Sequence, residues 1–341
     1  MNNKNIRNAD SPFRRFLRSD EIGVLVPLIG IIFITWIFRH DFVTGSNFMA
    51  MYMQIPFIAV VALGAAFPLM TGNVDISTGR VAGFAGVIMA ALATDGGWNI
   101  WLAMLFALTC AVAIGLINGV LVVLFGVNDF VATMGTLYMV GGARYLFIKG
   151  YQFSIKDLPT DTASWKLTQL FDKRFPSVAG EQNSGMPLYF WITIVIFVIA
   201  FFVIKKTLWG RRLLATGDNR EVATLAGINV TRMRMTAYVL SAVLSAIAGI
   251  LLTLDVGIGL PETGDGWEFK AIAGCAVGGV SLAGGKGSPL GIFIGVSLVF
   301  IAESAIIFLG LPTTMRVAVQ GALMAGAVLF DVYKQKRKVP A

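Results

Sequence analysis

The chain has 341 residues, of which 56% are hydrophobic and 13% are charged, and its mean hydropathy is +0.76. A soluble domain is typically about 45–50% apolar and about 25% charged, so this composition excludes an ordinary soluble protein. The net charge of +8 does not indicate nucleic-acid binding, because the basic residues cluster at the two chain ends and in residues 205–234. Apolar runs of about eighteen residues or more recur, which predicts an all-α polytopic membrane protein.

The chain has few of the residues that metal-dependent or catalytic-triad chemistry requires, with two cysteines and one histidine. Cys110 and Cys275 both lie in apolar segments, and the single histidine, His40, follows the first apolar run. These residues do not have the spacing of a metal site or of a disulfide framework. We therefore expect no catalytic residues, no metal and no cofactor, in a protein that is not an enzyme.

The chain is expected to begin in the cytoplasm. Residues 1–21 are polar and basic, which marks the cytoplasmic side of a membrane protein. No small-residue cleavage site follows the first apolar run, so we predict a retained helix rather than a signal peptide. The hydropathy pattern predicts ten transmembrane helices, at residues 22–38, 48–70, 80–94, 100–125, 130–147, 187–204, 235–256, 268–282, 289–309 and 313–332.

Residues 71–79 (TGNVDISTG) form a short polar segment between two apolar ones. Asp75 is one of few acids near a membrane span, and such an acid is a candidate functional residue. Asp75 and Ser77 are therefore candidates for a solute path. The alternative is that both side chains cap the N-terminus of the helix that follows.

Polar residues in the next two predicted helices add three candidates for the path. Asn118 lies in a run of small residues and needs a polar partner in an apolar medium. Thr133 and Thr136 are three residues apart, so they share one face of a glycine-rich helix. The alternative for this face is helix packing.

The longest loop covers residues 149–186, and its basic residues are largely offset by acids. This balance, with several aromatic residues, predicts a periplasmic position. A loop of this length is more often functional than a passive connector, so it is a candidate docking site for an external partner.

Residues 205–234 form the most basic internal segment, with seven Lys or Arg and two acids. The basic excess predicts a cytoplasmic position. Asn219 can cap a short helix over residues 220–226, which Gly227 then ends. A short helix parallel to the membrane is a suitable contact for a soluble partner; the alternative is a basic anchor loop.

The predicted topology is internally consistent. Ten crossings place the tail at 333–341 inside with residues 205–234, and they place residues 149–186 outside. The second to fifth and the seventh to tenth helices then enter from opposite sides. Each set has a glycine-rich polar turn after its first helix, at 72–79 and 257–267. The sequence thus predicts two halves of inverted topology, which are common in transporters. The short, Gly-rich segments at 80–94 and 268–282 could be partial or re-entrant.

Five blocks of the chain resemble, in order, the permeases of bacterial ABC importers of the ribose/branched-chain amino acid class. The blocks lie at residues 72–90, 115–142, 210–230, 269–295 and 319–331, within a match that runs over 50–333. The carbohydrate branch, with ribose, xylose, rhamnose and autoinducer-2 permeases, is the most similar. The chain departs from the usual pattern at residues 78–80 and at Ser241.

The resemblance implies a type II importer permease fold, with residues 22–332 as the membrane domain and no ATP hydrolysis by this chain. It implies that residues 205–234 contact an ATP-binding subunit through a coupling loop. The residues that match this loop are Gly210, Arg211, Gly217, Asn219, Arg220, Ala223 and Gly227. Two permease subunits, identical or similar, would form the path, and a periplasmic sugar-binding protein would deliver the solute.

The expected function is ATP-driven import of a monosaccharide across the bacterial inner membrane by alternating access. The same machinery carrying autoinducer-2, a nucleoside or an amino acid is the chief alternative. An ion-coupled secondary transporter would instead use Asp75, Asp255 and Glu303 as ion sites. A membrane scaffold is a third interpretation. Transport that needs an ATPase partner would indicate the ATP-driven importer. Transport that needs an ion gradient would indicate the secondary transporter.

Overall fold

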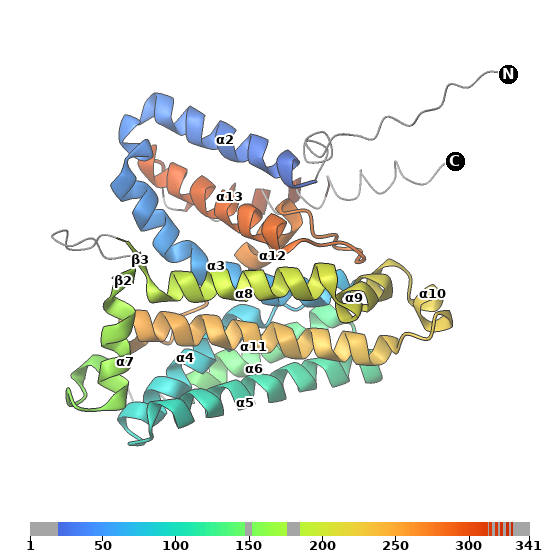
Figure 1. Cartoon of the computed structure of the whole chain (residues 1–341), viewed down its shortest axis with the longest axis horizontal. Coiled ribbons are helices and arrows are strands. Elements are labelled where there is room, and N and C mark those ends of the chain that lie inside the picture. The colour runs from blue at the N-terminus through green and yellow to red at the C-terminus, as the bar shows by residue number, and fades with distance from the viewer. Residues whose placement is uncertain are drawn as a thin grey trace.

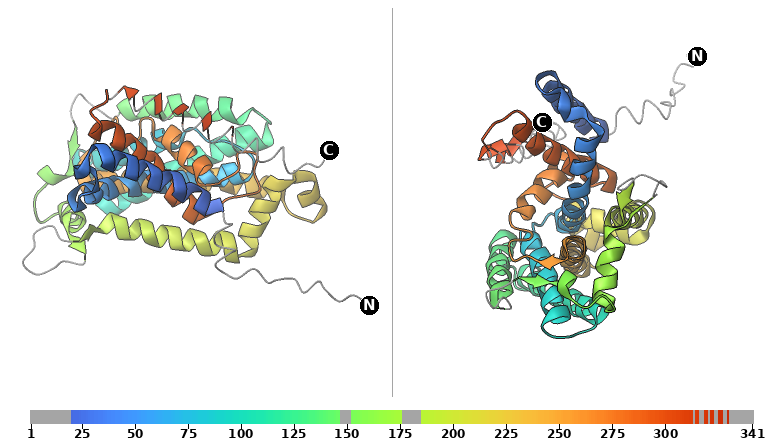
Figure 2. Two further views of the ribbon diagram at one scale, coloured as in Figure 1. Left: turned by 90° about the horizontal axis from the view of Figure 1, so that it is seen from above. Right: turned by 90° about the vertical axis from the view of Figure 1, so that its left-hand side faces the viewer.

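The computed structural model describes residues 20–146, 152–175 and 185–312, with further scattered positions between 314 and 329. Over these residues the chain is a helix bundle whose long helices run side by side (Figures 1 and 2). The predicted tails at 1–21 and 333–341 and the predicted helix at 313–332 lie wholly or largely outside the described residues, as does part of the loop at 149–186.

Helices form the bundle, and each strand has only two residues. The helices are α2 (Asp20–Phe38), α3 (Gly45–Met70), α4 (Thr78–Thr94), α5 (Ile100–Gly119), α6 (Asp129–Leu146), α7 (Ala163–Asp172), α8 (Leu188–Lys206), α9 (Leu208–Asp218), α10 (Arg220–Leu225), α11 (Val230–Val256), α12 (Trp267–Val277) and α13 (Pro289–Phe308). A π-helical turn, η2 (Val120–Leu124), continues α5, and the turns η1 (His40–Val43) and η3 (Ile155–Asp157) are 3-10 helical. Strand β1 (Phe153–Ser154) pairs antiparallel with β4 (Ile258–Gly259), and β2 (Arg174–Phe175) pairs antiparallel with β3 (Met186–Pro187).

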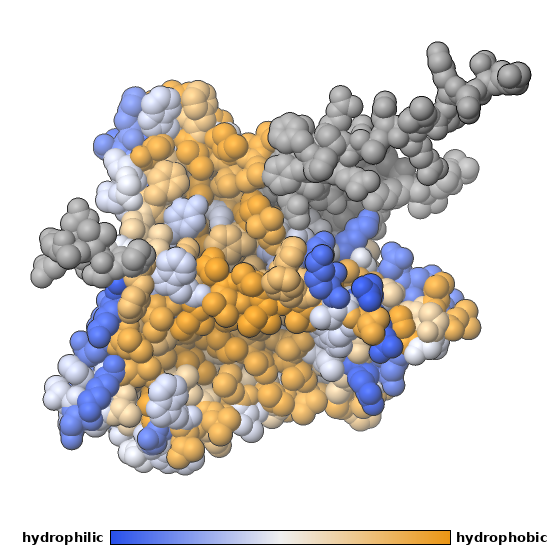
Figure 3. Space-filling model, in the orientation of Figure 1, coloured by the Kyte–Doolittle hydropathy of each residue, from blue (hydrophilic) through white to orange (hydrophobic). Residues whose placement is uncertain are grey.

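The molecule has the surface of a membrane protein. Within the described residues, five helices are long and apolar enough to cross a bilayer, namely α3, α8, α11, α13 and α5 with its continuation to Leu124. Shorter apolar helices lie at Leu25–Phe38 and Thr78–Thr94. A broad hydrophobic band separates two more hydrophilic ends, one around α7 and one around α9 and α10 (Figure 3).

The core forms around α3, whose residues from Ile55 to Met70 are all buried. Helix α3 packs against α11, α12 and α13, and α11 packs in turn against α3, α4 and α5. Small residues allow this close packing. The backbone of Gly64, for example, lies against the Ser241 carbonyl of α11, so a side chain at Gly64 would meet that oxygen.

Helices α4 and α12, both inside the bundle, are too short to cross the bilayer alone. Helix α4 has 17 residues and α12 has 11, so they are about 25 Å and 17 Å long, against a hydrocarbon core of about 30 Å. Each is preceded by an irregular segment, at 71–77 and 257–266. The predicted helix at 268–282 therefore ends early, at Val277, because Gly278 and Gly279 follow and Gly279 has a φ of +84°.

The basic segment at 205–234 contains more helix than predicted. Residues 208–218 form α9, whereas the sequence pattern predicts a loop there. Helix α11 begins at Val230 instead of residue 235, because the Asn229 side chain accepts a hydrogen bond from the Arg232 amide (2.8 Å) and caps the helix.

Candidate functional site

The predicted coupling segment folds into a capped helix at one hydrophilic end of the bundle (Figure 1). The Asn219 side-chain oxygen accepts hydrogen bonds from the amides of Glu221 (2.9 Å) and Val222 (3.0 Å), so Asn219 is the N-cap of α10. Gly227, with a φ of +76°, follows the end of the helix. The predicted short helix and its cap are confirmed, with its end at Leu225.

Helix α10 exposes apolar side chains at this hydrophilic end. Val222 is 60% exposed and Leu225 is 88% exposed, while Ala223 is buried against the bundle. Adjacent apolar side chains exposed on an otherwise polar surface are typical of a protein contact.

Arg220 joins α10 to the segment that follows α3. Its Nη2 donates to the carbonyls of Thr71 (3.3 Å) and Gly72 (3.2 Å) and to the side-chain oxygen of Asn73 (3.3 Å). Arg234 Nε donates to the same Asn73 oxygen (2.9 Å). These contacts tie α10 and the start of α11 to the first residues of the segment at 71–77, directly after α3.

The remaining predicted coupling residues support α9. The Gly210 amide donates to Thr207 Oγ1 (3.1 Å) near the start of α9, and Arg211 is exposed beside it. Gly217 lies so close to Met70 that a side chain would overlap the Met70 carbonyl, which also accepts from the Gly285 amide (3.0 Å). An open groove of about 430 Å³ lies between these parts of the chain. It is lined by residues 71–72 after α3, residues 217–221 of α9 and α10, and Ala283.

The structure brings the five predicted path residues together in the bundle interior. Asp75 accepts hydrogen bonds from the Ser77 amide (3.0 Å), the Ser77 hydroxyl (2.6 Å) and the Ser241 hydroxyl (2.8 Å). Asn118 donates to Ser77 Oγ (3.0 Å) and accepts from Thr136 Oγ1 (2.6 Å). All of these side chains are buried. They form one continuous hydrogen-bond network.

Thr133 joins the same region through the backbone, because its hydroxyl accepts from the Ile76 amide (3.3 Å). The alternative that Asp75 and Ser77 cap α4 is wrong. Ser77 occupies the N-cap position but makes no side-chain capping bond, since its hydroxyl oxygen accepts from Asn118 while its proton goes to Asp75.

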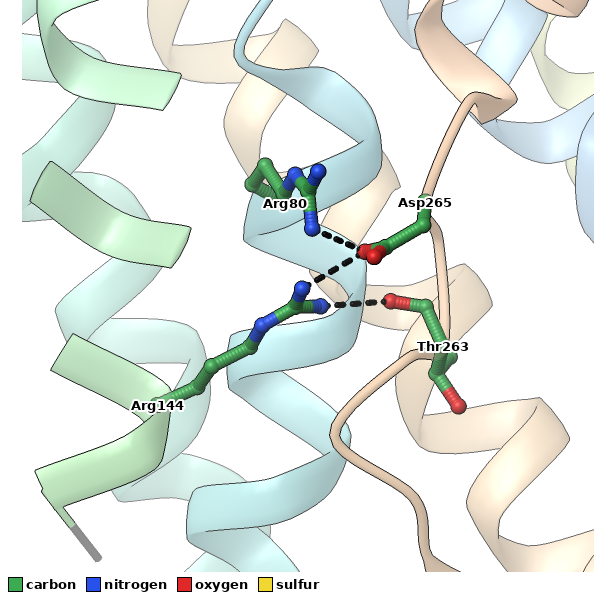
Figure 4. A network of polar contacts seen from close by, with 4 residues as sticks. All are labelled: Arg80, Arg144, Thr263 and Asp265. Carbon is green, nitrogen blue, oxygen red and sulfur yellow. Dashed lines mark hydrogen bonds and ion pairs between the residues drawn. The ribbon is translucent and has the colours of Figure 1, made fainter. Parts of the chain in front are cut away.

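A cluster of charged residues that the sequence pattern does not predict lies where α4, α6 and the segment at 257–266 meet (Figure 4). Arg80 of α4 and Arg144 of α6 both contact the Asp265 carboxylate, with Arg144 Nη2 2.6 Å from Asp265 Oδ1. Arg144 Nη1 also donates to the Thr263 carbonyl (3.1 Å). The available signal was an arginine inside each of two apolar segments, which is costly in a membrane unless the arginine has a partner.

These arrangements supply hydrogen bonds and ion pairs. Within the residues that the structure describes, no group of three or more His, Cys, Asp or Glu side chains is placed to hold a metal ion.

Comparison with known proteins places this chain among membrane transport proteins. The family model described as "Branched-chain amino acid transport system / permease component" matches residues 47–328. The L-arabinose ABC transporter permease protein AraH of Azospirillum brasilense is 30% identical over 298 residues, which is 87% of this chain and 83% of the relative. No solved structure matches the chain.

Two further relatives match over a similar length. The L-arabinose transport system permease protein AraH of Escherichia coli (strain K12) is 31% identical over 319 residues, covering 94% of this chain and 92% of the relative. The autoinducer 2 import system permease protein LsrC of Yersinia pestis (strain Pestoides F) is 29% identical over 318 residues, covering 93% and 86%.

Proposed function

Because this chain belongs to the family of branched-chain amino acid transport system permease components, we propose that it is the membrane subunit of an ATP-driven importer for a monosaccharide. The family confirms the resemblance that the five sequence blocks carry. The chain is a transport component rather than an enzyme. It is a multi-pass protein of the inner membrane.

The solute is proposed from the relatives. Two of them are L-arabinose permeases, which favours a monosaccharide. The second candidate is autoinducer 2, because LsrC is similar over almost the same length. Two features support an uncharged solute, since the buried network around Asp75 offers hydrogen bonds and the charged residues of the Arg80 cluster pair with one another.

The observation that carries the proposed mechanism is the exposed, capped helix α10. Its apolar residues Val222 and Leu225 suit docking to an ATP-binding subunit. When that subunit moves, Arg220 would transmit the movement to residues 71–73. These residues lead directly into the buried segment around Asp75 and then into α4, so movement at the surface would reach the bundle interior.

Several finer features belong to the same proposal. Ten transmembrane helices would be arranged as two inverted halves, with α3 and α4 corresponding to α11 and α12. In support, each of these pairs has a long helix, an irregular segment and then a short helix. Both termini and α10 would be cytoplasmic. Asp75, Ser77, Asn118, Thr133 and Thr136 would lie on or beside the solute path.

The partners are an ATP-binding subunit, a second permease subunit and a periplasmic sugar-binding protein. The loop at 149–186 would face that binding protein. Its described part contains α7, whose N-cap Thr162 accepts from the Trp165 amide (3.2 Å), so the loop carries ordered structure at the end of the bundle opposite α10 (Figure 1).

Substitution of Leu225 by Asp tests the docking role. We expect co-purification with the ATP-binding subunit to fall by about tenfold or more, since central apolar contacts carry much of an interface's energy. ATP-dependent L-arabinose uptake in proteoliposomes that also contain the binding protein should fall in parallel.

The matched control is Leu170→Asp, a leucine that is 39% exposed on α7 at the other end of the bundle, which should leave ATPase binding unchanged. Equal ATPase binding by Leu225→Asp and wild type would contradict the docking role. Uptake by wild type that follows an ion gradient without ATP would instead support a secondary transporter.

A further inference from the structure

We propose that Arg80, Asp265 and Glu268 form a binding site for the hydroxyl groups of an uncharged solute, halfway across the membrane. The proposal rests on the proposed import function and names a contact site for its solute. The site lies where α4 and α12 begin. Gly79 of α4 packs so closely on this region that a side chain there would overlap Glu268 Oε2 and the Gly264 carbonyl.

Contacts with α11 fix the depth of the site. Asp75, just before α4, bonds to Ser241, and Ala82 within α4 packs against the backbone of Gly249. Arg80 therefore lies between the levels of Ser241 and Gly249, near the middle of a helix of 27 residues. At 1.5 Å per residue that helix is about 40 Å long, so this level falls near the centre of a bilayer.

The solvent exposure of the Arg80–Asp265 ion pair identifies the face of the subunit that borders the solute path. The Arg80 side chain is 23% exposed and the Asp265 side chain is 37% exposed. Charged groups at this depth are strongly disfavoured next to lipid, and they normally face a bundle interior or a water-filled cavity. The face that carries Arg80 and Asp265 is thus the path side of the subunit.

Several polar atoms at this place have no partner within the described part of the chain. They are Arg80 Nε, Arg144 Nε and Glu268 Oε2, and all are buried. Glu268 is only 3% exposed. Buried polar groups normally have partners, so donors and acceptors left together indicate a missing ligand or water.

The chemistry of these groups selects the ligand class. The unpaired atoms include guanidinium N–H donors and a carboxylate acceptor, and a sugar hydroxyl can both donate and accept. Two arginines and two acids leave little net charge, so the site does not favour an ion. Arg144 is only 1% exposed, so it does not itself face the path. Its ion pair with Asp265 and its hydrogen bond to the Thr263 carbonyl fix the position of the Asp265 carboxylate.

The first experiment uses the complete transporter in proteoliposomes, with its ATPase and binding protein and with L-arabinose as the probe. Uptake by wild type is measured first, so a failure of the proposed function is seen separately. For Asp265→Asn and Arg80→Gln we expect uptake per ATP hydrolysed to fall by about tenfold, because a charge-assisted hydrogen bond to the solute is lost. ATP hydrolysis stimulated by the loaded binding protein should stay near wild type.

A control variant breaks another ion pair of α12. Lys270 Nζ lies 2.6 Å from Glu303 Oε2, and the double variant Lys270→Gln with Glu303→Gln should leave uptake per ATP unchanged. If uptake and ATP hydrolysis fall together in the Arg80 and Asp265 variants, these residues only support the structure and the proposal is wrong.

The second experiment measures water access and does not depend on transport. In a chain with Cys110 and Cys275 replaced by Ala, Arg80→Cys should react with a water-soluble thiol reagent, and L-arabinose should slow the reaction. Val195→Cys, an exposed apolar position within α8, should not react. No reaction at Arg80→Cys, or a reaction that L-arabinose does not slow, would overturn the proposal.

Discussion

At the scale of single residues, buried polar side chains here replace the backbone bonds that a helix would make. Residues 74–76 of the segment after α3 make no helical backbone hydrogen bonds. Asp129 Oδ2 accepts from the Val74 amide (2.8 Å), and the Tyr238 hydroxyl donates to the Val74 carbonyl (3.2 Å). Backbone groups without partners are strongly disfavoured in a membrane, so these side chains allow a non-helical segment at this depth.

Asn118 is the residue that links two helices in this network. Asn118→Leu removes its bonds to Ser77 and Thr136 at similar volume. We expect the free energy of unfolding in detergent to fall by about 1–3 kcal/mol, because buried polar partners lose a bond. Thermal unfolding measures the effect.

Thr109→Val is the matched control on the same helix. Its hydroxyl is exposed and bonds to the Leu105 carbonyl of α5, so we expect a change within about 0.5 kcal/mol. A similar loss in both variants would show that the Asn118 network contributes no more than a surface threonine.

At the scale of elements, short helices that follow irregular segments are the distinctive feature. Helix α4 follows 71–77 and α12 follows 257–266, and their N-terminal ends meet near Arg80 and Asp265. At the hydrophilic end, α9 packs on the end of α3 through Gly217. The helices around the proposed path are therefore held by side chains and close backbone contacts at their ends.

Gly217→Ala should disturb this packing, because the new methyl group would overlap the Met70 carbonyl. Backbone cannot move aside as a flexible side chain can, so we expect a loss of about 1–3 kcal/mol in stability. Displacement of α9 should also weaken co-purification with the ATP-binding subunit.

The control for this change is Gly135→Ala in α6, where a methyl group would meet no atom within 4 Å. Alanine favours helix over glycine, so stability should stay equal or rise slightly. The packing argument fails if Gly217→Ala unfolds at the wild-type temperature.

At the scale of the whole molecule, two hydrophilic ends bound a hydrophobic band (Figure 3). One end carries α9 and α10, with Arg211, Arg212 and Arg232 exposed, and the other carries α7. A Lys and Arg excess marks the cytoplasmic side. This distribution supports a cytoplasmic position for α10 and a periplasmic position for α7.

Thiol labelling of intact cells with an opened outer membrane tests this orientation. In the background without Cys110 and Cys275, Lys166→Cys on α7 should react with a membrane-impermeant reagent. Thr224→Cys on α10 should react after the inner membrane is permeabilised and not before. The reverse order would place α10 outside and would remove its docking role.

The sequence by itself determined the features that depend on local signals. Hydropathy gave the membrane class and the long helices, since burial in lipid requires an apolar run whatever the partner. Asn219 and Gly227 bounded α10, because a cap acts within a few residues. The blocks of similarity gave the family. The predicted count of ten helices and the role of the path residues stay predictions.

Only the tertiary structure decided which distant residues meet. Arg80 and Asp265 are 185 positions apart, and no local pattern pairs them. The sequence leaves Asp75 with two interpretations, a path residue or a helix cap, and only packing against α11 brings its carboxylate to Ser241. Helix α9 was missed because it is short and polar, and its position depends on contact with α3. Packing of small residues brings these segments together, so the site appears only when the whole chain is folded.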